Sequence, residues 1–366
     1  MAGTVARGSA SRRGAANARS GIRGKAPREP RRRLSWPSDA PPVGIHLGVA
    51  GGLLKAARRA RQIGATALQI FGDNPTAWRR RPEPPRDAEA FVAYCAQNGI
   101  GPISIHASYL INLAGSAEPF ATQSREGLLH EMQRAPAYGA TLVNTHIGSH
   151  RGLGHAAGIR RVAEHVAAIL VDSPASVQLV LENSAGGGDN IGASLEDLAA
   201  ILDAASGLGS DARRLGFCLD TAHLWGAGHD ISTAEGVTRL LDRFDELIGL
   251  DRLRLVHLND SRSELGSRND RHEHLGSGRI GAEGLGAMLR DPRVAGHAAV
   301  MLETPGVDDG YDAVNMRRAR LLYGGALTLP VLPPGAFKLN RRSTRAGPGE
   351  RVKRRAQARR AVPATE

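Results

Sequence analysis

Eight short apolar segments, each followed by a longer stretch with helical spacing, set the tightest limit on how this chain folds. The segments are four to eight residues long and rich in aliphatic and β-branched residues, which is typical of strands buried on both faces. The intervening stretches place apolar residues three and four positions apart, which indicates amphipathic helices; examples are residues 51–65, 194–205 and 314–325. The eight segments are residues 44–50, 67–71, 102–107, 141–148, 178–183, 215–221, 253–260 and 298–304.

This alternation predicts an α/β protein with a parallel sheet, and eight units close most simply into a single TIM (β/α)8 barrel over residues 41–330. The alternative is an open doubly wound sheet, which wants a glycine-rich phosphate turn after its first strand. The GVAGG segment at residues 48–52 does not match that pattern, so we favour the barrel. Ser194, with Asp197 three residues on, resembles a helix-capping signal.

The basic excess of the chain lies in its two ends. Residues 1–40 and 331–366 each carry ten Arg or Lys residues against two acidic residues, so the net formal charge of +12 leaves −4 for the segment between them. Both ends are poor in large apolar residues, and we expect them to be disordered. They fit a sequence-independent grip on a polyanion such as DNA, and equally a solubilising tail or, at the N-terminus, a mis-assigned start codon. An organellar transit peptide at the N-terminus is a less favoured alternative.

Membrane insertion and disulfide chemistry find no support in this sequence. The apolar runs are too short for a transmembrane helix, and no apolar region of a secretory signal follows the basic N-terminal segment, so we expect a cytoplasmic protein. Cys95 and Cys218 cannot form a disulfide scaffold or a thiolate metal site by themselves, and we expect both to be buried thiols.

Imidazole and carboxylate groups stand where the predicted strands end, and in such a barrel the strand ends carry the reactive groups. Six successive strands end in one of these groups, one more follows strand six, and two lie in the loop after strand seven. The nine residues are His106, His146, Glu182, Asp220, His223, His257, Asp270, His272 and Glu303.

Any of these residues alone is more simply explained as a structural histidine, a helix cap or an ion-pair partner, but the joint pattern is different. Four crowded carboxylates need a counter-charge, and the whole chain has only four lysines, so metal cations are indicated. Imidazole with carboxylate suits Zn²⁺, with Mn²⁺ or Fe²⁺ also possible. Nine ligands exceed one ion, so we expect two or three ions. Asp270 and His272 can chelate one ion, whereas Asp220 and His223 serve neighbouring ions.

Such a cluster suits hydrolysis at phosphorus, because two cations lower the pKa of a shared water from about 15.7 towards about 7 and neutralise the attacking and departing oxygens. Long segments of the chain also resemble the endonuclease IV (deoxyribonuclease IV) family of apurinic/apyrimidinic endonucleases. They are IHASYLINLAG (105–115), NTHIGSH (144–150), LENSAGGGDNIG (181–192), CLDTAHLWGAGHD (218–230), VHLNDSRSELGSRNDRHEHLGSGRIG (256–281) and LETPG (302–306). The resemblance covers about residues 44–325.

That resemblance implies a TIM-barrel nuclease with three Zn²⁺ ions per chain, for which Mn²⁺ is a possible substitute. Its partner would be double-stranded DNA containing abasic sites, cleaved on the 5′ side of the lesion to leave a 3′-hydroxyl and a 5′-deoxyribose phosphate, with 3′-end cleaning besides. A monomer is expected. By motif, the first ion would be held by His106, His146 and Glu182, the second by Glu182, Asp220, His257 and Glu303, and the third by His223, Asp270 and His272. Glu182, His146, Asp220 and Glu303 would also be the catalytic residues.

In that family a Tyr-Leu pair wedges into the duplex, and the SYL segment supplies Tyr109 and Leu110 at this place. One departure is Thr76, where some members carry an arginine that also enters the base stack. The arginines at 79–81 follow at once and could contact phosphates or form a solvated face. His46 has no assigned role, and His274 competes with His272 as a ligand by spacing.

Two other functions remain open at this point. A sugar isomerase or epimerase on the same barrel would use a set such as Glu182, Asp220, His257 and Glu303, but would not need the other five groups. A non-catalytic DNA-binding protein would work through the basic ends, so removal of residues 1–40 and 338–366 should abolish its function but not that of a nuclease.

Overall fold

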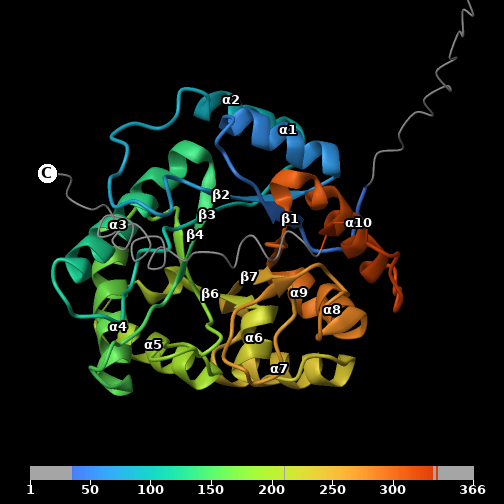
Figure 1. The fold of residues 1–366 in the computed structure, drawn as a ribbon. Coiled ribbons are helices and arrows are strands. Elements are labelled where there is room, and N and C mark those ends of the chain that lie inside the picture. The colour runs from blue at the N-terminus through green and yellow to red at the C-terminus, as the bar shows by residue number, and fades with distance from the viewer. Residues whose placement is uncertain (1–34, 210, 333–334, 337–366) are drawn as a thin grey trace, which may run out of the picture. The chain divides into compact units, whose positions relative to one another are not determined.

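The structure, a computed structural model, describes residues 35–209, 211–332 and 335–336. Eight parallel strands close into a barrel in the order β1-β10-β7-β6-β5-β4-β3-β2, which confirms the predicted TIM barrel (Figure 1). A two-stranded antiparallel pair, β8 and β9, lies in the loop that follows β7. The strands are β1 Val43–His46, β2 Ala67–Phe71, β3 Ile103–His106, β4 Ala140–His146, β5 Gln178–Glu182, β6 Leu215–Asp220, β7 Leu253–His257, β8 Asp260–Ser261, β9 His272–Glu273 and β10 Ala299–Leu302.

Helices surround the barrel, and their apolar faces pack on its outer surface (Figure 1). In α1, for example, the buried positions include Leu53, Ala57, Ala60 and Ile63, the spacing of one helical face. No helix in residues 35–209 and 211–332 is both long and apolar enough to cross a membrane. The helices are α1 Leu53–Ile63, α2 Ala88–Gln97, α3 Phe120–Arg134, α4 His155–Asp172, α5 Leu195–Gly207, α6 Thr221–Ala227, α7 Ala234–Leu247, α8 Gly281–Arg290, α9 Pro292–His297 and α10 Tyr311–Tyr323.

The interior of the barrel changes from apolar to polar along the strands. Because successive side chains of a strand point to opposite faces, every second residue faces the inside. The lower layer forms an apolar cluster of its own, and the next inward position on several strands is polar and fully buried, as Gln69, Asn144, Glu182 and His257 illustrate. The apolar cluster consists of Ala67, Leu142, Val180, Cys218, Leu255, Ala299 and Met301. The inward-facing residues of the strands thus form an apolar layer, followed by a polar layer nearer the carboxyl ends of the strands.

The strand register brings the polar ends together. His146 of β4 is the direct neighbour of Glu182 on β5, and Asp220 of β6 is the direct neighbour of His257 on β7. Since paired strands lie about 4.8 Å apart, side chains on one face at these positions are in reach of each other. A close approach at the other side of the barrel depends on Gly44, where a Cβ would collide with the carbonyl oxygen of Ala67.

The structured part of the chain extends beyond residues 41–330 at both ends. The Trp36 ring lies edge-on to that of Tyr323 at 6.0 Å, and its Nε1 donates to the carbonyl of Gly64. At the other end Leu332 and Ala336 are buried. Residues 1–34 and 337–366, which contain most of both tails predicted to be disordered, lie outside the described residues.

Local signals in the sequence also have the expected outcome. Ser194 precedes α5, and its hydroxyl accepts a hydrogen bond from the backbone N–H of Asp197 at 3.2 Å, as the capping pattern predicts. Cys95 and Cys218 are free and buried, also as predicted. Burial raises the pKa of the Cys218 thiol to about 12, so it stays protonated at neutral pH in the absence of a metal.

Candidate metal centre

Glu182 stands at the centre of a cluster of histidines at the barrel mouth. Its carboxylate lies 3.2 Å from His223 Nδ1, 3.4 Å from His257 Nδ1, 3.5 Å from His106 Nε2 and 3.6 Å from His146 Nε2. Glu182, His106, His146 and His257 each end a strand, so the barrel register brings them together, and His223 lies in the first turn of α6, which follows β6 directly. The Glu182 side chain is completely buried. A single carboxylate surrounded by four imidazoles is suited to bridge two cations.

The remaining candidate residues complete the cluster. His257 Nδ1 lies 3.3 Å from Glu303 Oε2 and 3.9 Å from Asp220 Oδ2, while His272 Nε2 lies 3.5 Å from Asp220 Oδ2. Three groups of these residues contain no cysteine, and within each group the candidate ligand atoms all lie within 4.8 Å of one another. They are His106, His146 and Glu182; Glu182, Asp220, His257 and Glu303; and Asp220, His223 and His272.

Asp270 joins the third set from the loop after β7. Its two carboxylate oxygens contact different histidines, with Oδ1 3.1 Å from His272 Nε2 and Oδ2 3.4 Å from His223 Nε2. The three-residue spacing of Asp220 and His223 has a local cause. Asp220 caps α6, and its Oδ1 accepts the backbone N–H of His223 at 2.8 Å. All nine residues singled out from the sequence therefore meet at one mouth.

Hydrogen bonds to backbone carbonyls orient the histidine rings. Nδ1 of His106 lies 2.8 Å from the Ala107 carbonyl, and Nδ1 of His272 lies 3.0 Å from the Glu303 carbonyl. Because a carbonyl only accepts, each Nδ1 carries a proton, and each Nε2 is turned towards the carboxylates. Metal-binding histidines typically have their second nitrogen fixed in this way.

Buried amides that the sequence analysis missed form a second layer. Gln69 Nε2 donates to Glu303 Oε1 at 2.7 Å, and Gln69 Oε1 lies 3.2 Å from His257 Nε2. Asn144 donates to Glu182 Oε2 at 2.6 Å, and Asn259 donates to Asp220 Oδ2 at 2.7 Å. The signal was available, because each is a polar residue within or directly after an apolar strand segment.

Other histidines near the mouth differ in their surroundings. His46, which had no assigned role, lies with Nδ1 2.9 Å from Glu303 Oε1 and so belongs to the layer around that carboxylate. His274 is buried, and its Nδ1 pairs with the Asn315 amide at 2.9 Å. The choice of His272 over His274 as the residue at the cluster agrees with this arrangement.

The electrostatics of the cluster favour charged groups despite burial. Burial opposes ionisation of Glu182, but the neighbouring His257 and His146 outweigh it and hold the pKa of this carboxyl well below its ordinary value. Burial also lowers the pKa of His272, but Asp270 and Asp220 more than compensate and raise it to about 10. Without a cation, a proton on His272 therefore offsets part of the negative charge of Asp270 and Asp220.

The residues fit a metal cofactor by a direct structural test. Glu182 Oε1, His257 Nδ1 and His272 Nε2 are buried polar atoms that no hydrogen bond in the described part of the chain satisfies. Unsatisfied buried polar atoms are costly. Here Glu182 Oε1 lies 3.4 Å from His257 Nδ1, and His272 Nε2 lies 3.5 Å from Asp220 Oδ2. Divalent cations bound between these groups would satisfy them, because imidazole nitrogen and carboxylate oxygen are the usual ligands of zinc and related divalent metals.

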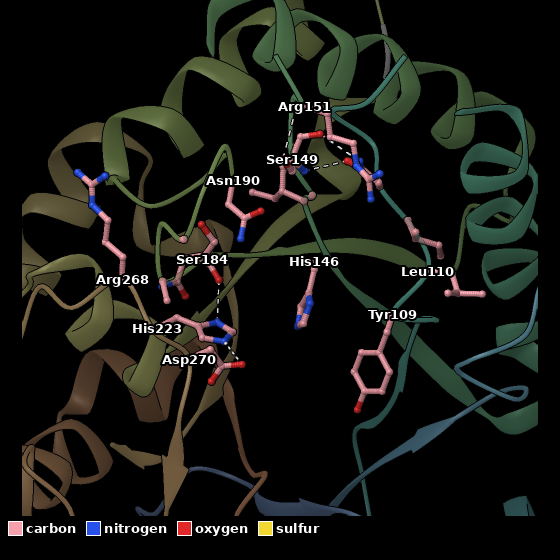
Figure 2. A pocket seen from close by; sticks show the side chains of 17 residues that line it. Tyr109, Leu110, His146, Ser149, Arg151, Ser184, Asn190, His223, Arg268 and Asp270 are labelled. Atoms are coloured by element: carbon pink, nitrogen blue, oxygen red, sulfur yellow. Dashed lines mark hydrogen bonds and ion pairs between the residues drawn. The ribbon is translucent and has the colours of Figure 1, made fainter. Parts of the chain in front are cut away.

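A cavity of about 300 Å³ opens over this cluster (Figure 2). His146 lies in its middle, with Tyr109 and Leu110 on one side and His223 and Asp270 on the other. Tyr109 is 55% exposed, and its ring lies 5.7 Å from that of His106, so the aromatic side chain projects at the edge of the metal centre.

The loop that follows β2 is held in place by local hydrogen bonds and ion pairs. The hydroxyl and the backbone N–H of Thr76 both donate to Asn74 Oδ1. Arg80 pairs with the buried Glu131 at 3.4 Å, and Arg81 pairs with Asp73 at 3.3 Å. These two arginines therefore fasten the loop to the protein.

This chain is similar to known proteins in both sequence and structure. Residues 57–320 match the family model described as "Xylose isomerase-like TIM barrel". The "Probable endonuclease 4" of Natranaerobius thermophilus is 39% identical over 77% of this chain and 98% of its own length. The crystal structure of endonuclease IV from Thermus thermophilus is 36% identical, with a TM-score of 0.67, and covers 78% of this chain and 100% of its own.

More distant structures share the fold alone. The D-psicose 3-epimerase of Clostridium cellulolyticum H10 is 14% identical to this chain, with a TM-score of 0.53 over 77% of this chain and 97% of its own. The barrel architecture is therefore shared between nucleases and sugar epimerases, and the residues at its mouth have to decide between the two activities.

Proposed function

Because the chain belongs to the endonuclease IV family of nucleases, we propose that it is a zinc-dependent DNA repair enzyme that incises DNA at abasic sites. It hydrolyses the phosphodiester on the 5′ side of the lesion and leaves a 3′-hydroxyl and a 5′-deoxyribose phosphate. The same centre removes blocked 3′ ends, and the enzyme acts as a monomer on double-stranded DNA.

The observation that carries this proposal is the convergence of nine imidazole and carboxylate groups, with three buried atoms left unsatisfied. We assign them to three Zn²⁺ ions, with Mn²⁺ as a possible substitute. His106, His146 and Glu182 hold the first ion and His223, Asp270 and His272 the third. Glu182 also bridges to the second, which is completed by Asp220, His257 and Glu303.

When bound, divalent cations at such a centre lower the pKa of water and neutralise charge on the oxygens of an in-line displacement at phosphorus. The side chains of the chain itself orient and enclose the reacting group. Glu182, Asp220 and Glu303 are held by amide donors from Asn144, Asn259 and Gln69, so their oxygens are fixed before substrate enters. His146, more exposed than the other histidines of the cluster, faces the open cavity.

Tyr109 and Leu110 open the duplex in this proposal. Both line the cavity over the metal centre, and Tyr109 is exposed although it is aromatic. Apolar side chains inserted at a base step unstack the duplex at a cost of a few kcal/mol, which is least where a base is already missing. The displaced abasic sugar then enters the cavity of about 300 Å³ that leads to the cluster.

The residues at the mouth argue against a sugar epimerase. Such an enzyme would be served by Glu182, Asp220, His257 and Glu303. The chemistry of an epimerase does not require the five further imidazole and carboxylate groups that lie around the same carboxylates. The contacts of His223 with Glu182 and Asp270 illustrate these additional groups.

Incision of a labelled duplex with one abasic analogue tests the proposed function. We expect one nick on the 5′ side of the analogue, a 3′ terminus that a polymerase can extend, and loss of activity after chelation. An unmodified duplex of the same sequence should stay intact. A cut on the 3′ side, equal cutting of both duplexes, or turnover of ketoses without nicking would contradict the proposal.

Two variants test the metal assignment. Glu182→Ala and His257→Ala should each abolish incision, because each removes a ligand at the centre of the cluster. Glu235→Ala and His297→Ala are matched controls, since both residues are exposed and lie outside the cavity. Near wild-type cleavage by Glu182→Ala or His257→Ala, with metal still at full occupancy, would defeat the assignment.

A further inference from the structure

A second cavity lies beside the catalytic one, and the two share a wall. It has a volume of about 260 Å³ and is lined by Trp78 and Phe120, among others. Tyr109, Leu110 and Arg151 line both cavities, so the turn proposed to open the duplex separates them. Figure 2 shows these three residues along the rim of the catalytic cavity, across from His223 and Asp270.

The second cavity gathers aromatic side chains that the chain otherwise uses sparingly. Only 4% of the sequence is aromatic. Among the described residues, the large exposed hydrophobic side chains include two aromatic ones, Tyr109 at 55% and Phe120 at 54%, and both line this cavity. The Trp78 and Phe120 rings stand 6.5 Å apart with their planes tilted by 35°. Exposed rings gathered at one cavity indicate a ligand with an aromatic face.

The indole of Trp78 supports the same conclusion. The chain has three tryptophans, and the other two use their ring N–H: Trp36 Nε1 donates to the Gly64 carbonyl and Trp225 Nε1 donates to the Ser263 carbonyl. No described residue accepts a hydrogen bond from Trp78 Nε1. An unused donor beside two aromatic faces suits a flat ligand with acceptor atoms at its edge.

Arg151 adds a cation to the rim. Its backbone is left-handed, with φ of 45°, which is costly for a residue other than glycine and is found mainly at functional sites. The loop is fixed by Asn112, whose amide donates to the Ser149 carbonyl and accepts the Ser149 N–H. The guanidinium of Arg151 itself has no ion pair within the described residues. An unpaired guanidinium on a fixed loop is suited to a phosphate.

We propose that this second cavity holds the unpaired nucleotide that stands opposite the abasic site, with its base against Trp78 and Phe120 and its phosphate on Arg151. The inference rests on the proposed function, because it takes DNA as the substrate. Removing one base leaves a single partner base unpaired, and that base costs least to displace from the helix. A nucleotide combines an anionic phosphate with an aromatic base, and these two groups match Arg151 at the rim of the cavity and the aromatic rings that line it.

A fluorescent base tests the inference with the metal-loaded, full-length protein. The lesion duplex carries 2-aminopurine opposite the abasic analogue, and a methylphosphonate at the scissile linkage prevents cleavage. This base is dark when stacked and bright in water. We expect it to stay dark when wild type binds, and to brighten with Trp78→Leu and Phe120→Leu, because it then extends into solvent. Arg151→Ala should weaken binding of the lesion duplex.

Matched controls isolate the cavity. Leu208→Ala removes an equally exposed apolar side chain elsewhere, and Arg268→Ala removes another arginine with positive φ that lines the catalytic cavity only; neither should brighten the probe. A probe at a paired flanking position should respond equally in all variants. Loss of one stacked base corresponds to about 5- to 150-fold weaker lesion binding for Trp78→Leu.

The outcomes separate the two proposals. If wild type nicks an unmodified-linkage lesion duplex, but Trp78→Leu and Phe120→Leu match wild type in probe brightness and lesion binding, the nucleotide cavity is wrong and the nuclease assignment stands. If wild type does not nick that duplex, both fail. Brightening of the opposite probe in wild type itself would show a solvent-exposed base and would also overturn the inference.

Discussion

Gln69 offers a sharp test of how the metal centre is held, because it touches two proposed ligands at once. Its side chain is fully buried on β2, donates to Glu303 at 2.7 Å and accepts from His257 at 3.2 Å. Gln69→Leu keeps most of the volume and removes both hydrogen bonds. We expect the second ion, held by Glu182, Asp220, His257 and Glu303, to bind more weakly while the barrel still folds.

The expected magnitude follows from these two contacts. A hydrogen bond to a charged group contributes about 1.5–3 kcal/mol and a neutral one about 0.5–1.5 kcal/mol. Loss of an outer partner of a metal ligand typically costs 10- to 100-fold in affinity, or about 1.4–2.7 kcal/mol. We therefore predict that one of the bound ions is lost 10- to 100-fold more readily to a competing chelator, with a parallel fall in incision at limiting zinc.

Competition with a chromophoric chelator measures this change directly, and circular dichroism reports whether the variant is folded. Gln62→Leu is the matched control, because Gln62 is exposed on α1 and its side chain accepts a hydrogen bond from Arg59, away from the metal centre. A folded Gln69→Leu protein that holds every ion within twofold of wild type would refute the reasoning, since the buried amide would then have no part in binding the metal.

Three further predictions concern the wedge, pH and the loop after β7. Tyr109→Ala should reduce the ratio of binding to a lesion duplex over an intact one, measured by anisotropy; an unchanged ratio would make the wedge role wrong. Asp270 and Asp220 raise the pKa of His272 to about 10, so zinc must displace a proton from this residue. Calorimetry should therefore show proton release on zinc binding at pH 7.5 and an affinity for zinc that falls as the pH is lowered. A zinc affinity that does not change with pH would contradict this. Asp260 accepts hydrogen bonds from the backbone N–H groups of Ser261, Gly278, Ile280 and Gly281. Asp260→Asn should therefore lower the free energy of unfolding in denaturant by about 1–3 kcal/mol and weaken binding of the third ion. An unchanged free energy of unfolding would show that Asp260 does not anchor the loop.

The barrel and the main cluster could be predicted from the sequence because both follow from regular periodicity. Apolar runs of strand length, separated by helical spacing, leave few architectures, and closure places all strand ends at one mouth. His106, His146, Glu182, Asp220 and His257 each end a strand, so a one-dimensional pattern was enough to bring them together.

The second layer was harder to predict, because its partners are far apart in sequence. Gln69 contacts a carboxylate 234 positions away, and only the closed order of the barrel, with β1 and β10 as neighbours, brings the two together. A polar residue in the middle of ALQIF was the available signal. Its partner could not be identified without the register.

The second cavity was not predictable at all from local patterns. Trp78 lies in the loop after β2 and Phe120 at the start of α3, and no periodicity in the sequence connects the two positions. The arginines at 79–81 also had two possible roles, and the contacts of Arg80 and Arg81 with Glu131 and Asp73 favour a structural one. Loop side chains depend on tertiary packing, which sequence periodicity does not describe.

The central claim is that the strand-end residues cage several divalent ions that the nuclease activity requires. Elemental analysis of the purified chain, combined with an abasic-site nicking assay during stepwise removal and return of zinc, tests it most directly. We predict about three zinc ions per chain, with nicking lost as they are removed and regained as they return. Full nicking by protein that contains no divalent metal, or an active enzyme with a single ion per chain, would contradict the account.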